Sequence, residues 1–198
     1  MGAACNRSGS SGQPDPHPSL LPSGAHLTRS DLEPDSSPPP KAKLVLAGVT
    51  VPVQVKTERN SNLFTIDLVT HDEIFDTEEY VNTSDGFAVK SVAGTEFDPP
   101  LPLLKFPLVV GAETLTWSGV LSADVEPHQG TAQVTTSTDS LTVGLSSVPT
   151  VRVQVSIVLD SIKVGESAER QLNFWFEPKK GLIKREFGTT SSREPVES

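Results

Sequence analysis

The sequence predicts an all-β fold, built as a single curved antiparallel sheet that forms a half-barrel or an open barrel. Three observations lead to this prediction. Apolar and polar residues alternate through most of residues 42–190, turn-forming residues separate the alternating segments, and no segment has the apolar spacing of an amphipathic helix. A sheet with one apolar and one polar face is typical of antiparallel strands, because parallel sheets are apolar on both faces.

The clearest strand is "TVRVQVSIVLD", residues 150–160. Its apolar face consists of Val151, Val153, Val155, Ile157 and Leu159. Only Val158 interrupts the polar face. Residues 151–159 would extend about 30 Å. A strand of this length favours a large curved sheet over a compact sandwich.

Shorter strands are predicted on the N-terminal side of this long one. Residues 44–55 predict one or two strands, with Pro52 at an edge or a bulge because proline has no amide donor. "NLFTIDLVT" predicts a strand with Phe64 on its apolar face. In "EEYVNTSDGFAVKSV", Asp85-Gly86 supplies the positive φ angles of a tight hairpin.

The segment Thr70–Glu79 leaves two interpretations open. Thr70 followed by Glu73 imitates a helix capping box. The β-branched and aromatic neighbours favour a strand that continues through the segment. Its acidic run, from Asp72 to Glu79, is interpreted as a solvated face in preference to a cation site.

A proline-rich strap is predicted next, in "FDPPLPLLKFPLVVG". Its prolines are Pro99, Pro100, Pro102 and Pro107, and its apolar residues include Leu101, Leu103, Leu104 and Phe106. Because prolines lack amide donors, the segment cannot be a central strand. We expect an extended strap across the sheet, with the apolar side chains reaching into the core.

A C-terminal hairpin is predicted from "RQLNFWFEPKKGLIKREFG". Leu172, Phe174 and Phe176 alternate with polar or amphipathic residues, and Gly181 closes a Pro-Lys-Lys-Gly turn where a left-handed residue is expected. The hairpin resembles a Trp/Tyr-Phe-x-Pro-x-x-Gly-Leu/Val-Ile/Val-Lys motif that ends many uncharacterised secreted bacterial proteins and lipoproteins. The matching residues are Trp175-Phe176, Pro178 and Gly181-Leu182-Ile183-Lys184, with Pro107-Leu108, Gly111, Trp117 and Gly119 upstream. The chain departs from that pattern at Leu115, Glu177 and Lys179-Lys180.

Such proteins are distantly similar to periplasmic lipoprotein carriers, in which a curved antiparallel sheet encloses an acyl-binding cavity. The resemblance implies an apolar cavity here, and the candidate lining residues are Phe64, Leu104, Trp117, Val155 and Phe174. The carriers also have helices that form a lid, and no such helices are predicted in this sequence.

Residues 1–41 predict a disordered tether, because Ser, Pro and Gly dominate and the few apolar residues follow no period. Residues 191–198 predict a disordered C-terminal tail. "MGAAC" resembles the end of a bacterial lipoprotein signal, which implies a lipid anchor at Cys5 and no other membrane attachment. The alternative is an unmodified Cys5 in an unstructured terminus.

Several classes of function are disfavoured. The formal net charge of −9 opposes a nucleic-acid-binding role. A single Cys excludes an internal disulfide and a four-thiolate zinc site. His71 and His128 are interpreted as solvated loop residues, and His17 and His26 fall within the tether. The sequence contains no phosphate loop, nucleophile elbow or metalloprotease motif, so we expect no enzymatic activity, no metal and no cofactor.

The leading hypothesis is a non-enzymatic exported protein of the bacterial cell envelope, lipid-anchored, periplasmic or secreted. Its curved sheet would bind an apolar ligand such as a lipid, or a protein partner. One alternative is a structural or interaction module with a filled core. The other is an enzyme whose active-site residues lie on loops.

Overall fold

The computed structural model describes residues 20–32, 41–123, 126–160, 168–188 and 191–196. The barrel strands are β2 (Lys41–Leu46), β3 (Val49–Asn60), β4 (Leu63–Thr70), β5 (Glu73–Asn82), β6 (Gly86–Val92), β7 (Thr95–Lys105), β9 (Thr114–Ala123), β10 (Glu126–Val143), β11 (Ser146–Leu159), β12 (Ala168–Glu177), β13 (Gly181–Phe187) and β14 (Ser191–Pro195). Outside the barrel are β1 (His26–Leu27), the helix α1 (Arg29–Leu32) and β8 (Leu108–Val109).

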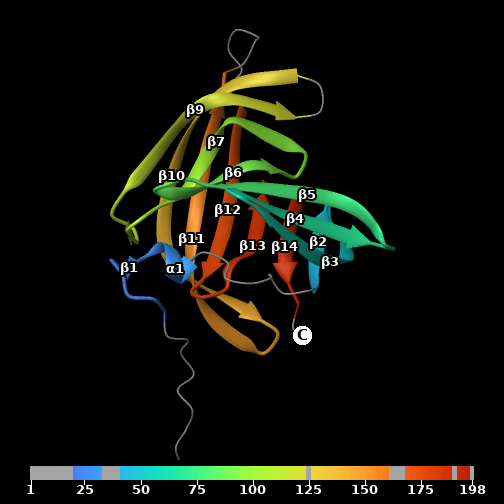
Figure 1. The fold of residues 1–198 in the computed structure, drawn as a ribbon, viewed down its shortest axis with the longest axis horizontal. Helices are drawn as coiled ribbons and strands as arrows, with labels where there is room; N and C mark the ends of the chain where they lie inside the picture. Colours follow the sequence, from blue (N-terminus) through green and yellow to red (C-terminus); the bar gives the residue numbers. More distant parts are fainter. Residues whose placement is uncertain (1–19, 33–40, 124–125, 161–167, 189–190, 197–198) are drawn as a thin grey trace, which may run out of the picture.

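Twelve strands form one closed barrel (Figure 1). Their order around the barrel is β10-β11-β12-β13-β14-β2-β3-β4-β5-β6-β7-β9, with β9 pairing back onto β10. The prediction of an all-β fold made from a curved antiparallel sheet is confirmed. The curvature exceeds that of a half-barrel, since the two ends of the sheet meet.

The C-terminal strand β14 closes the gap between β13 and β2. Arg193 pairs with Arg185 on one side and with Leu44 on the other. The prediction of a disordered tail from residue 191 is therefore wrong for Ser191–Pro195. This segment is short and polar, so its own sequence carries no strand pattern. Pairing on both sides stabilises it, because closure removes two exposed sheet edges.

The proline-rich segment forms β7, which is paired along most of its length with only one of its two neighbouring strands. Its side facing β6 is paired along most of its length, whereas pairing with β9 is confined to Thr95–Asp98. The expectation that the segment could not be a central strand is confirmed beyond Asp98, although it lies within the barrel wall and does not cross the sheet. At this seam Gly119 approaches closely, because an added Cβ would lie 2.5 Å from the Asp98 carbonyl oxygen.

Residues 20–32 pack against the barrel, and here the prediction of a disordered tether is wrong. β1 pairs with β8, and Leu32 at the end of α1 is buried in the core. Thr28 begins the helix with a hydrogen bond from its hydroxyl to Asp31 Oδ2 at 2.6 Å. The expected tether residues 1–19 and 33–40, together with Cys5, lie outside the described residues.

Two contacts fasten α1 to barrel turns. The Lys179 amide donates to the Asp31 carbonyl oxygen at 2.6 Å, and Arg29 Nη2 donates to the Thr83 carbonyl oxygen at 2.6 Å. These bonds hold the N-terminal segment beside the β12–β13 and β5–β6 turns (Figure 1). None of the helices in the described ranges is long and apolar enough to cross a bilayer.

The ambiguous segment Thr70–Glu79 is a hairpin, so the strand interpretation is confirmed over the helix. His71 and Asp72 form its turn, with φ angles of 49° and 64°. The strand does not run straight through, because these left-handed residues reverse the chain.

The C-terminal hairpin of β12 and β13 forms as predicted. Phe174 and Phe176 are buried in the core, and Gly181 has a φ of 76° in the turn. Trp175 points to the outer face but is also buried. Its indole Nε1 donates to Asp139 Oδ2 at 2.9 Å, and Lys184 Nζ lies 4.8 Å from its ring centroid.

Candidate functional site

A cluster of charged side chains lies inside the barrel and connects β5 to β13 and β14. Glu78 and Arg185 are fully buried, and Arg193 is 1% exposed. Along β5, Glu78 and Tyr80 share the inward face because strand side chains alternate. Arg185 and Arg193 lie opposite each other on neighbouring strands, so both guanidinium groups reach the same carboxylate.

The Glu78 carboxylate accepts four hydrogen bonds. Arg185 Nε and Arg193 Nε donate to Oε1 at 2.8 and 2.9 Å. Arg193 Nη2 and the Tyr80 hydroxyl donate to Oε2 at 3.1 and 2.9 Å. A buried carboxylate offers about four acceptor sites, so this one is saturated.

The other guanidinium nitrogens also have partners. Arg185 Nη1 donates to Ser191 Oγ at 2.5 Å, and Arg185 Nη2 donates to Asp76 Oδ2 at 3.2 Å. Arg193 Nη1 lies 3.4 Å from the Ile183 carbonyl oxygen. With Asp76 ionised, two positive and two negative charges balance within the cluster.

The cluster holds Glu78 in its ionised form. Burial opposes ionisation, but the charges of Arg193 and Arg185 outweigh it and lower the pKa of Glu78 to about 2. Burial and the Glu78 charge raise the pKa of Tyr80 well above its ordinary value. Neither group exchanges a proton near neutral pH, so the cluster suits a structural role better than acid–base catalysis.

Asp76 differs from Glu78 because burial raises its pKa, against the opposing charge of Arg185. The folded protein therefore binds a proton at Asp76 more tightly than the unfolded chain does. Lowering the pH from neutral should stabilise the fold through Asp76. Further acidification, through the range between about 4.5 and about 2, should remove the stabilisation from Glu78.

We expect Asp76→Asn to abolish the gain at mildly acidic pH. The free energy of unfolding should be measured with urea from neutral pH down to the acid transition. As the pH falls, it should rise less in the variant than in the wild type. The wild-type minus variant difference should grow as the pH falls. A constant difference across this range would contradict the assigned role of Asp76.

A cavity of about 460 Å³ opens between β2, β3 and β4, near the end of β14. Its lining residues are Lys41, Ala42, Pro52, Val53, Gln54, Val69, Thr70, His71, Asp72 and Val196. Ala42, Val53 and Val69 are buried and form an apolar floor, whereas the polar side chains belong to residues that are exposed or half-buried.

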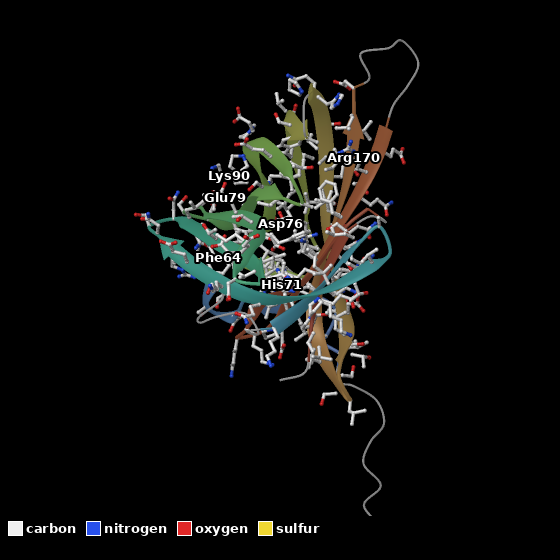
Figure 2. All side chains as sticks on the ribbon, turned by 90° about the vertical axis from the view of Figure 1, so that its right-hand side faces the viewer. Phe64, His71, Asp76, Glu79, Lys90 and Arg170 are labelled. Carbon is white, nitrogen blue, oxygen red and sulfur yellow. The ribbon has the colours of Figure 1, made fainter. Side chains whose placement is uncertain are left out.

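The strand register places this cavity beside the charged cluster. Ala42 pairs with Val53 on β3 and with Pro195 on β14. Arg193 lies two residues before Pro195 on the same face of β14, and it pairs with Leu44. The cavity floor is thus adjacent in the sheet to the row that carries one of the two buried arginines. The hairpin that carries His71 also carries Asp76 (Figure 2).

The five residues expected to line a cavity are brought together in the core. Phe64, Leu104, Trp117, Val155 and Phe174 are each 6% exposed or less and belong to one apolar cluster. None of them lines the cavity between β2, β3 and β4. Trp117 lines a separate hollow formed by β9, β10 and β11, and its Nε1 donates to the Pro99 carbonyl oxygen at 2.7 Å.

The histidines do not form a reactive site with carboxylates in the described ranges. His71 is exposed in the β4–β5 turn, where its Nδ1 lies 3.3 Å from Thr70 Oγ1. His128 lies within β10, although the sequence suggested a loop. No group of three His, Cys, Asp or Glu side chains suited to a metal ion occurs among the described residues.

Comparison with solved structures finds three bacterial proteins that resemble this chain, one of them with a TM-score of 0.50. A protein from Parabacteroides distasonis, described as a candidate lipoprotein, matches 85% of this chain and 97% of its own with a TM-score of 0.50 and 13% identity. The fold is shared. At this identity the likeness shows the fold alone.

Two other solved structures are less similar to this chain. A candidate exported protein with a YmcC-like fold from Bacteroides fragilis has a TM-score of 0.47 and 9% identity, over 85% of this chain and all of its own. The hypothetical lipoprotein YmcC from Escherichia coli has a TM-score of 0.43 and 10% identity, over 83% of this chain and 90% of its own. No protein-family model matches the chain, and no curated protein matches its sequence.

The charged cluster was not predicted from the sequence. The acidic run was interpreted as a solvated face, but Glu78 is two residues from Tyr80, and both point inward. The alternation of Asp76, Glu78 and Tyr80 was the available signal for a buried carboxylate. For Arg193 no comparable signal exists, because its segment has no apolar alternation.

Proposed function

We propose that the chain is a non-enzymatic exported protein of the bacterial cell envelope, which binds a small apolar ligand in the cavity between β2, β3 and β4. The cavity carries this proposal. Its volume of about 460 Å³ falls within the range typical of small-molecule sites. Its buried floor of Ala42, Val53 and Val69 is apolar, and Lys41 and His71 at the margin provide polar contacts.

The envelope location rests on two kinds of support. The C-terminal hairpin resembles those of secreted bacterial proteins and lipoproteins, and a protein of similar fold is described as a candidate lipoprotein. A lipid anchor at Cys5 would place the barrel at a membrane surface. Intact-mass analysis of the protein made in its own host tests this part, because an unmodified Cys5 would contradict the anchor.

A second location for the ligand is the core itself, against Phe64, Leu104, Trp117, Val155 and Phe174. All five side chains are buried in one apolar cluster, so a ligand could enter only if strands separated. This same packing favours a second candidate function, a structural or interaction module with a filled core.

Binding of a fluorescent fatty acid distinguishes these possibilities. We expect saturable binding that Gln54→Trp weakens by about tenfold or more, because a large side chain at the cavity margin would occupy the ligand's place. Gln171→Trp, at an exposed position on β12, is the matched control and should bind as the wild type does.

Two other results of the fatty-acid binding experiment would contradict this proposal. Binding that Gln54→Trp leaves unchanged would place the ligand in the core and contradict the proposed cavity. Absence of saturable binding in the wild type would contradict ligand binding and favour the structural module.

A further inference from the structure

One strand of the barrel has an edge that lacks a neighbour. The Glu73–Glu78 part of β5 pairs with β4, but the pairing of β5 with β6 begins only at Glu79. Among the described residues, no strand pairs with Glu73–Glu78 on the second edge, although the Thr77 amide donates to Asp76 Oδ1 at 2.9 Å within the strand. Six residues extend about 20 Å, which is the length of an ordinary strand.

The pairing of β5 with β6 ends at Glu79 and Ser91, and Lys90 is the neighbour of Ser91 on β6. Its Nζ lies 3.0 Å from Glu79 Oε2 (Figure 2). Toward the β4–β5 turn the hairpin projects sideways from the barrel (Figure 1). The free edge therefore lies on the projecting part of the hairpin, where Glu73, Ile74 and Phe75 are exposed.

Apolar side chains are exposed along this edge. Ile74 is 63% exposed and Phe75 is 50% exposed. Phe75 has no partner on β4, because β5 has a bulge at this position: Leu68 pairs with Asp76, and the next residue, Val69, pairs with Ile74. Adjacent large apolar side chains beside unpaired backbone groups are the features that strand addition uses.

The negative charge of residues 72–79 determines which kind of strand can be added to this edge of β5. Residues 72–79, "DEIFDTEE", contain five carboxylates and no basic residue. Glu78 is neutralised by the buried arginines, and Glu79 pairs with Lys90. Asp72 and Glu73 are exposed, and no ion pair is formed by either among the described residues.

These charges disfavour a second copy of the chain as the added strand. Pairing β5 with β5 would oppose like carboxylates, and each copy carries a net charge of −9. A basic strand would instead place its cations beside the carboxylates of Asp72 and Glu73. The attraction between these opposite charges would favour binding and speed association.

We propose that Glu73–Glu78 of β5 is a docking edge that receives an extended basic segment of a partner protein as a thirteenth strand. Backbone hydrogen bonds supply the pairing, and Ile74 and Phe75 contact apolar side chains of the incoming segment. This edge meets the cavity between β2, β3 and β4 at Asp72, which lines the cavity, but strand pairing along Glu73–Glu78 does not require the apolar ligand.

The probe is a labelled peptide of about ten residues in which Lys alternates with Val, a length that covers the edge. Fluorescence anisotropy should show binding that weakens as the salt concentration rises. Hydrogen exchange should slow at the amides of Glu73–Glu78. The same peptide with alternate amides N-methylated should bind about tenfold more weakly or worse, because it cannot complete the ladder. A peptide with Glu in place of Lys should not bind.

Matched variants separate a specific edge from general charge attraction. Glu73→Lys should weaken binding severalfold, whereas Glu113→Lys, an exposed position with the same change of net charge, should not. Phe75→Thr should also weaken binding, with the exposed Val158→Thr as its control.

Three results would overturn the proposal. They are equal binding of the N-methylated peptide, equal weakening by Glu73→Lys and Glu113→Lys, and protection of amides away from β5. If the protein alone forms a dimer that protects Glu73–Glu78, the partner is a second copy, and the basic segment is wrong.

Discussion

Replacing Glu78 with Gln should lower the free energy of unfolding by about 3–5 kcal/mol, because it breaks a buried ion-pair cluster. The variant keeps the side-chain shape but removes the charge that Arg185 and Arg193 share. Two buried guanidinium groups would then have only the carboxylate of Asp76, which contacts Arg185 alone. Urea denaturation should show a lower midpoint with an unchanged slope.

Glu79→Gln is the matched control for this prediction. Glu79 is the next residue of β5, but its side chain is 27% exposed and its ion pair with Lys90 is at the surface. We expect a loss of at most about 1 kcal/mol. Equal destabilisation by the two substitutions would show that the buried cluster contributes nothing beyond a surface pair.

Ending the chain after Gly188 should have a still larger effect, because it removes β14. The truncated barrel would have open edges on β13 and β2, and Glu78 would lose the Arg193 side chain. We expect loss of the cooperative thermal transition seen by circular dichroism, together with aggregation through the exposed edges.

Glu194→Ala tests whether this effect comes from the strand or from its surface charges. Glu194 lies on β14 and pairs with Lys184 at 3.2 Å, with its side chain 40% exposed. This variant should melt within a few degrees of the wild type. A truncated chain that still melts cooperatively near the wild-type temperature would show that closure by β14 is dispensable.

The fold could be predicted from the sequence wherever side-chain alternation and local turn chemistry agree. Residues 151–159 form the predicted strand in β11, and Gly181 adopts the expected left-handed conformation. Pro52 lies where β3 pairs with β2 alone, as the missing amide donor requires. In each case the deciding interaction is local, so a short window of sequence contains it.

The interactions that close the barrel are not local. Ser191–Pro195 is a strand because β13 and β2 flank it, and Arg193 is buried because Glu78 lies across the interior, 115 positions away in the chain. Residues 20–32 are ordered by bonds to turns at Thr83 and Lys179. Composition alone favours disorder for both segments, and only the assembled barrel supplies the partners that overcome it.

The pairing of β14 with β2 also governs when the molecule can finish folding. This pairing brings Arg193 against Leu44, so the barrel wall is incomplete until β14 has been synthesised. Contacts of such long sequence separation form late and slowly. The nascent chain therefore cannot close its barrel before β14 has been made.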